Sequence, residues 1–175
     1  YGLPFRSSST NAANAVDAQA AYESEMSLWA AIMGHSNLMH HCCGWLEGGL
    51  TASYEKMIVD AEMLQMMIEY VQPVSVNEDT LALSAIAEVQ PGGHFFGAAH
   101  TLERYEDIFY QPLVSDWRNF ESWSADGAKS ATQRAHEIWK QLLKDYEKPP
   151  IDPAIEEELQ AYMARRKEEI AREGE

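Results

Sequence analysis

Hydrophobic residues recur every three or four positions along several stretches of the chain, a spacing that predicts amphipathic α-helices. The clearest stripe runs over 51–71, where Thr51 offers an N-cap and Glu55 adds negative charge to the first turn. A second stripe predicts a helix over 17–33 that ends at Gly34. Further helices are expected over 77–89, 101–109, 128–146 and 152–172.

Short apolar runs bounded by glycine or polar residues predict strands instead. Residues 37–43 form one such run, and Tyr1 to Phe5 is typical of the end of another that leads into a polar loop over 7–14. Residues 72–76 suit a few extended positions after the long helix. Because strands and helices alternate, we expect an α/β fold that is mostly helical, with two or three short parallel strands.

The composition indicates a globular chain with one sizeable core: 175 residues, of which 46% are hydrophobic and 23% charged. Thirteen basic against 28 acidic residues give a net charge of -15, which would repel nucleic-acid phosphates and anionic lipids. No apolar run approaches the roughly 20 residues that cross a bilayer. We therefore expect neither a nucleic-acid nor a membrane partner, and a cytoplasmic location.

Two histidines and two cysteines, residues 40–43, suggest a zinc site by composition. On a strand, however, successive side chains point to opposite faces, so one tetrahedral ion cannot collect all four, and we expect no metal. An adjacent cysteine pair also closes only a strained disulfide, which fits a reducing compartment. Either the thiols and one histidine pack in the interior, or His41, favoured over His40, faces a cavity at the end of the strand.

The run from Gly44 to Thr51 lies between this strand and the long helix, where α/β proteins place binding loops. It presents the indole of Trp45 close to the carboxylate of Glu47, a combination that suits a quaternary ammonium group. The more frequent arrangement has the indole filling core space and the carboxylate favouring the positive end of the helix dipole.

A third cluster combines glycines with His94, Phe95 and Phe96 on an irregular segment. It could form a lid over a pocket, although a wedge between the sheet and the terminal helices is the more frequent arrangement. No Ser-His-Asp order and no carboxylate pair emerges from the spacing, so no catalytic residue is assigned.

Several long runs carry a family resemblance: DAQ (17–19), GWLEGGLTASYEK (44–56), AEVQPGGHFFG (87–97), HTL (100–102), LVSDWRNF (113–120) and PIDP (150–153). In these runs the chain resembles the trimethylamine methyltransferase family, corrinoid-dependent enzymes that include glycine betaine methyltransferases. The resemblance extends over nearly the whole chain.

The resemblance implies a (β/α)₈ barrel roughly two to three times as long as this chain. Residues 1–110 would be its last βα units, and residues 111–175 a C-terminal helical extension packed on the barrel. Family members transfer a methyl group from a quaternary or tertiary amine to the cobalt of a partner corrinoid protein, which docks over the barrel mouth. This chain would then bind no cofactor directly.

The resemblance also suggests roles for the candidate residues. Trp45, Phe95 and Phe96 would cage the amine, Glu47 would complement its charge, and His41 or His94 would contact the substrate's carboxylate or the partner's corrin. Some members carry pyrrolysine, whereas this sequence has only standard residues, which favours a betaine over trimethylamine.

Two other functions remain open from the sequence: a stand-alone helical interaction domain without catalysis, and a barrel that binds another small cation. The chain would also associate, either with the remainder of its own barrel or as a homo-oligomer. Large exposed apolar patches would favour a part of a barrel over a stand-alone domain.

Overall fold

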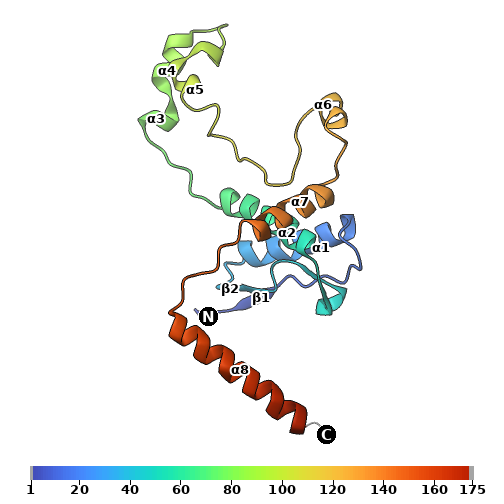
Figure 1. Ribbon diagram of the computed structural model, residues 1–175. Helices are drawn as coiled ribbons and strands as arrows, with labels where there is room; N and C mark the ends of the chain where they lie inside the picture. Colours follow the sequence, from blue (N-terminus) through green and yellow to red (C-terminus); the bar gives the residue numbers. More distant parts are fainter. Residues whose placement is uncertain (1, 174–175) are drawn as a thin grey trace. The chain divides into compact units, whose positions relative to one another are not determined.

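The computed structural model describes residues 2–173 and divides into two compact units, Tyr1–Gln141 and Leu142–Glu175 (Figure 1). Helices dominate both units. The predicted division at residue 110, between barrel units and an extension, stays a prediction. The strand end predicted over residues 1–5 begins at Tyr1, which lies outside the described residues.

The first unit begins with a β-α-β arrangement. Strand β1 (Arg6–Ser8) pairs in parallel with β2 (Leu38–His40), in the register Arg6↔Leu38 and Ser8↔His40, and helix α1 (Ala18–Met33) connects them. The predicted alternation of strand and helix is confirmed here, although β1 lies just after the segment expected to be extended. Within residues 2–173 the parallel sheet has two strands, so the barrel itself stays a prediction.

Helix α1 begins and ends as the sequence predicts. The Asp17 carboxylate accepts from the amides of Gln19, at 2.9 Å, and Ala20, at 3.3 Å, and Gly34 is the C-cap. The long helix α2 (Tyr54–Tyr70) also forms, but the prediction of Thr51 as its N-cap is wrong. Ser53 caps it, accepting from Lys56 N, because Thr51 is held in a strand.

That strand belongs to a small hairpin that the sequence did not predict. Strand β3 (Trp45–Leu46) pairs antiparallel with β4 (Thr51–Ala52) around a 3₁₀ turn, η1 (Glu47–Gly49). The turn has positive φ at all three positions, including 52° at Glu47, which is uncommon for a residue with a side chain. The predicted loop between β2 and α2 is therefore an ordered structure.

The predicted helix over 77–89 is two helices, α3 (Glu78–Leu81) and α4 (Leu83–Val89). They separate at Ala82, whose φ of 52° is left-handed, while Asn77 forms the capping box that opens α3. Residues 91–98 are irregular, as expected, apart from the 3₁₀ turn η2 (Phe95–Gly97). The helix expected over 101–109 is instead the short α5 (Ala99–Leu102), and 72–76 contain no strand.

Two small apolar clusters hold the first unit together. One joins Ala13, Ala20 and Leu46, and the other joins Ile58, Val114 and Ala135. The second cluster packs α7 (Ala131–Lys144), which is shorter than predicted, against α2. Beside this cluster, the buried carboxylate of Glu62 on α2 accepts a hydrogen bond from the amide of Ser115 at 3.1 Å. Helix α6 (Phe120–Ala125) lies between these elements in the sequence.

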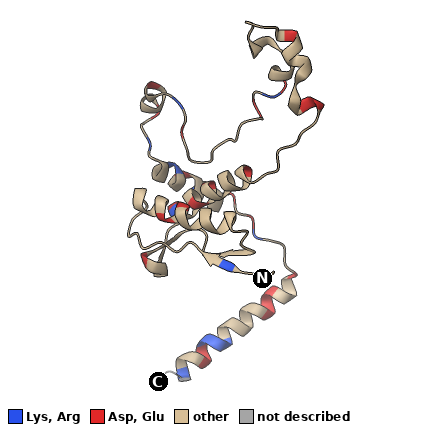
Figure 2. Ribbon diagram, turned by 180° about the vertical axis from the view of Figure 1, so that it is seen from behind, with Lys and Arg blue, Asp and Glu red and all other residues tan. Residues whose placement is uncertain are grey.

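The second unit consists mainly of α8 (Pro153–Glu173), which confirms the predicted terminal helix. Asp152 caps it by accepting from Ala154 N at 2.9 Å, and Pro153 takes the first helical position. Acidic and basic residues form successive groups along the helix (Figure 2), with an ion pair between Arg166 and Glu169. Among the described residues, no helix is long and apolar enough to cross a membrane.

Candidate functional site

The carboxyl ends of β1 and β2 lie at one edge of the parallel sheet, where α/β proteins place their binding residues. Ser8 is the last residue of β1, and His41 follows the last residue of β2. The Ser8 hydroxyl lies 3.3 Å from Nδ1 of His41 and 3.2 Å from the hydroxyl of Thr10. The two strand ends are therefore joined by side chains as well as by the backbone ladder.

Two of the predicted site residues, His41 and Trp45, are in direct contact. Their rings meet edge to face, with centroids 5.5 Å apart and an interplanar angle of 89°. His41 has a positive φ of 51°, and its side chain is exposed, whereas Trp45 is half-buried. The turn after β2 thus directs the imidazole toward the indole rather than along the strand.

The Glu47 backbone is fixed while its carboxylate is free. Its amide donates to the carbonyl of Ala13 at 3.0 Å, so the hairpin is tied to the loop after β1. Within residues 2–173 the carboxylate itself makes no hydrogen bond or ion pair. This exposed, unpaired carboxylate lies two residues after Trp45 in the sequence and is available to a cation.

A buried polar network connects α1 and α2 with the residue that precedes the hairpin. The Lys56 ammonium contacts both carboxylate oxygens of Asp60, at 2.5 and 2.6 Å, and the Ser24 hydroxyl at 2.6 Å. Oδ2 of Asp60 also accepts from the amide of Gly44 at 2.8 Å. Helices α1 and α2 therefore anchor the backbone immediately before Trp45.

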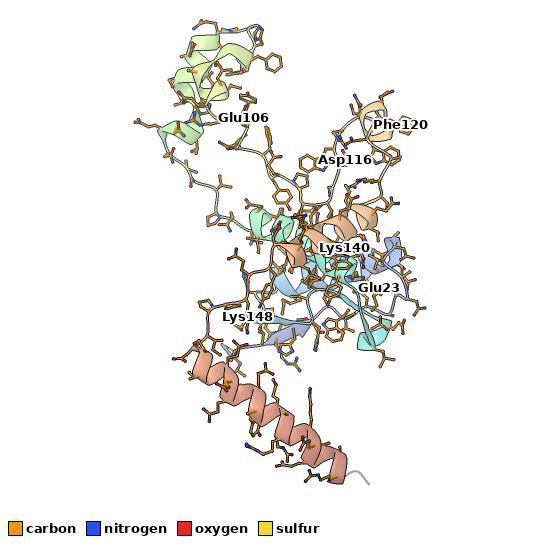
Figure 3. The ribbon with its side chains drawn as sticks, viewed as in Figure 1. Glu23, Glu106, Asp116, Phe120, Lys140 and Lys148 are labelled. Atoms are coloured by element: carbon orange, nitrogen blue, oxygen red, sulfur yellow. The ribbon has the colours of Figure 1, made fainter. Side chains whose placement is uncertain are left out.

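The same network reaches the loop after β1 through Asn11. Its side chain accepts from Ser24 Oγ at 3.0 Å and donates to the carbonyl of Ala20, and its own carbonyl accepts from Gly48 N at 2.7 Å. The Glu23 carboxylate, labelled in Figure 3, caps the same loop by accepting from Ala12 N. Its hydrogen bond with Gln19 is the main cause that lowers the pKa of Glu23.

Sequence reasoning missed the network residues Asn11, Ser24 and Asp60, and gave Lys56 no role. One signal for them was present: a lysine and an aspartate four residues apart within the apolar stripe of α2. Such spacing places both side chains on one helix face, and a charged pair on a buried face must be matched internally.

The adjacent cysteines are free thiols in the turn after β2, because the strand predicted over 37–43 ends at His40. The thiol of Cys43 donates to Sγ of Cys42 across 3.8 Å, and both side chains are half-buried. Burial, followed by the neighbouring Cys42, raises the pKa of Cys43 to about 12, so this thiol stays protonated. Among the described residues, no three His, Cys, Asp or Glu side chains come together to hold a metal ion.

The other three predicted residues lie in a different segment. His94 and Phe96 contact each other with ring centroids 5.6 Å apart beside Phe95, and Phe96 is 82% exposed. No ring contact or hydrogen bond between described residues joins them to His41 or Trp45. The cage that would combine the two groups stays a prediction.

A cavity of about 410 Å³ lies near that segment, between α3 and the residues around α5. His100 Nε2 lies 2.8 Å from the carbonyl of Asp79, and the Asp79 carboxylate pairs with Arg104. This ion pair lowers the pKa of Asp79 and raises that of Arg104. Since the polar groups of this cavity satisfy one another, it offers a ligand less free charge than the strand ends do.

Comparison with known proteins gives consistent results. A family model described as trimethylamine methyltransferase matches residues 1–171. The chain is 39% identical, over 99% of its length, to a glycine betaine methyltransferase of Desulfitobacterium hafniense, of which it covers 36%. It is 33% identical, over 94% of its length, to the trimethylamine methyltransferase MttB1 of Methanosarcina acetivorans, of which it covers 33%. The chain thus spans about a third of the length of these relatives.

Proposed function

Because this chain belongs to the trimethylamine methyltransferase family, we propose that it is the C-terminal portion of a methyltransferase. The complete enzyme would move a methyl group from a quaternary or tertiary amine to the cobalt of a cognate corrinoid protein. The observation that carries the proposal is the contact between His41 and Trp45 at the carboxyl ends of two parallel strands, in a chain of this family.

The architecture supports a place in a larger (β/α)₈ barrel. A parallel β-α-β unit is the repeating element of that fold, whose active sites lie at the carboxyl ends of the strands. Large apolar side chains on α1 remain uncovered, including Met26, 77% exposed, and Tyr22, 59% exposed. Apolar exposure on this scale favours a part of a barrel, covered by further elements, over a stand-alone interaction domain.

The side chains at the strand ends suit an amine. An indole face attracts a cation through its quadrupole, which serves a quaternary ammonium that has no N–H to donate. Trp45 would provide that face, His41 would fix the angle of the indole, and the free Glu47 carboxylate would balance the positive charge. An imidazole also offers a hydrogen bond to a substrate carboxylate, as in a betaine.

Transfer of a methyl group from a quaternary nitrogen needs little acid-base catalysis. The carbon–nitrogen bond breaks, its electron pair stays on nitrogen, and no proton moves when the neutral tertiary amine leaves. The docked partner's corrinoid would supply the nucleophile that takes the methyl group. The residues of this chain would bind and orient the amine and exclude water from its charged nitrogen.

A betaine is the preferred substrate in this proposal. The identity of 39% to a glycine betaine methyltransferase exceeds the 33% to a trimethylamine methyltransferase, and this sequence contains only standard residues. A carboxylate on the substrate would also give His41 a partner.

The test is methyl transfer by the whole natural protein, supplied with a reduced corrinoid protein from the same cells. Glycine betaine and trimethylamine are offered separately, and the methylated corrinoid is followed by its absorption spectrum. Methylation from glycine betaine supports the proposal. Transfer from trimethylamine alone would overturn the substrate preference, and transfer from no amine would overturn the proposed reaction.

A further inference from the structure

Cys42 and Cys43 occupy the turn that shapes the candidate site, and the proposed methyl transfer does not use them. They separate His41, which contacts Trp45, from Gly44, which is bound to Asp60. They are the two cysteines of these 175 residues, so a disulfide formed within this segment must join these two neighbours. Their sulfur atoms are already 3.8 Å apart.

A disulfide between adjacent residues is strained, and therefore easily reversed. Neighbouring Cα atoms are about 3.8 Å apart across a trans peptide, whereas disulfides usually join Cα atoms at least about 4.4 Å apart. Strain raises the reduction potential, which is typical of labile and regulatory disulfides rather than structural ones. The bond would thus form under oxidant and yield to ordinary cellular thiols.

We propose that Cys42 and Cys43 are a redox modification site, which peroxide converts into a reversible vicinal disulfide that separates His41 from Trp45. The inference stands apart from the proposed methyl transfer, because its consequence lies in the geometry of the turn.

The reaction balances with hydrogen peroxide as the oxidant. The Cys42 sulfur attacks peroxide, the O–O bond breaks, and Cys42 becomes a sulfenic acid while one water leaves. Cys43 then displaces hydroxide from the Cys42 sulfur, and its thiol proton converts that hydroxide to a second water. Two thiols are oxidised and one peroxide is reduced. The 3.8 Å separation of the two sulfur atoms places Cys43 within reach of a sulfenic acid on Cys42.

Closing the ring moves the backbone toward His41 rather than toward α2. Gly44 is buried, and a Cβ at this position would lie 3.2 Å from the Ser53 carbonyl oxygen and 3.3 Å from Cβ of Met57. There is no space for movement on that side, and the Asp60 carboxylate holds the Gly44 amide. His41 is exposed and already has a positive φ, so the backbone change that ring closure requires takes place at His41.

The experiment treats the whole natural protein with hydrogen peroxide and then with N-ethylmaleimide, and maps residues 42 and 43 by mass spectrometry. We expect a peptide that has lost two hydrogen atoms, carries no maleimide and regains both reactive thiols in glutathione. Selective histidine and tryptophan labelling then shows the nuclear Overhauser contact between His41 and Trp45 in the reduced protein and its loss after oxidation.

Cys42→Ser and Cys43→Ser are matched controls, because each removes one of the two sulfur atoms that the ring requires. Both should keep the His41–Trp45 contact after peroxide treatment. The proposal is overturned if both wild-type thiols stay reactive toward maleimide, if oxidation gives only sulfinic acid or interchain dimers, or if the contact survives disulfide formation.

Discussion

Lys56 and Asp60 form an ion pair inside the protein, with Nζ and Oδ1 2.5 Å apart and only 1% of each side chain exposed. The two residues are one turn apart on α2, and the pair connects the turn before Trp45, through Gly44, with the loop after β1, through Ser24 and Asn11. Its role is therefore to fix the loops as well as to compensate two buried charges.

Removing one charge of this pair should destabilise the protein strongly. Lys56→Met leaves the Asp60 carboxylate buried without its cation, and we expect a loss of about 3–5 kcal/mol in the free energy of unfolding. Urea unfolding measures it, with the exposed Lys144→Met as a control that changes stability by less than about 0.5 kcal/mol. A Lys56→Met protein as stable as the control would show that the pair is not buried as described.

Two serines near the site should respond in opposite ways to loss of their hydroxyl group. Ser24 accepts from Lys56 and donates to Asn11, so Ser24→Ala leaves buried partners unsatisfied and should cost about 1–3 kcal/mol. Ser9 is equally buried, but within residues 2–173 its hydroxyl has no partner, so Ser9→Ala should be neutral or stabilising. Thermal unfolding measures the stability of the two variants. An equal loss of stability in both would contradict the hydrogen-bond network described for Ser24.

Acid should weaken the contact between α2 and α7 through Glu55. Its hydrogen bond with His136, followed by that with Trp139, lowers the pKa of Glu55 from 4.5 to about 2. A lowered carboxyl pKa stabilises the fold fully above pH 4.5, and this contribution is lost as the pH falls toward 2. Between these values the wild type should lose more stability than Glu55→Gln. Melting temperatures of the two proteins against pH test this, and parallel curves would refute it.

The free carboxylate of Glu47 should contribute to cation binding but not to folding. We expect Glu47→Gln to weaken the binding of a quaternary ammonium about two- to fivefold, the effect of an exposed charge pair of up to about 1 kcal/mol. Added salt should reduce this difference. Calorimetric titration at two salt concentrations measures it, with Glu106→Gln as a control away from the strand ends. Identical affinities for wild type and Glu47→Gln would exclude this role.

Much of the helical structure could be predicted from the sequence, because periodicity and capping are local signals. Helices α1 and α2 follow their apolar stripes, and α8 begins at Pro153, directly after Asp152, as expected. The hairpin β3–β4 could not be predicted in this way, since it depends on backbone bonds from Glu47 and Gly48 to the loop after β1. Those bonds join residues more than 30 positions apart.

The residues of the candidate site also differ in how far local sequence signals could predict their arrangement. His41 and Trp45 are close in sequence, so a single turn after a strand is enough to bring their rings into contact, although the sequence analysis did not predict this contact. Asn11 and Ser24 carry no local signal, because their importance arises only when α1 packs beside α2. Phe95 and Phe96 would have to approach Trp45 from a segment still farther away in the sequence, and their part in the cage stays a prediction.

The most direct test of the account is the affinity of the whole natural protein for glycine betaine, measured by calorimetry for the wild type, Trp45→Ala and Trp45→Phe. If Trp45 provides the face for the quaternary nitrogen, Trp45→Ala should lose about tenfold or more in affinity, and Trp45→Phe should retain part of it because a phenyl ring keeps a weaker quadrupole. Glycine betaine bound equally well by all three proteins would contradict a binding site at the carboxyl ends of β1 and β2.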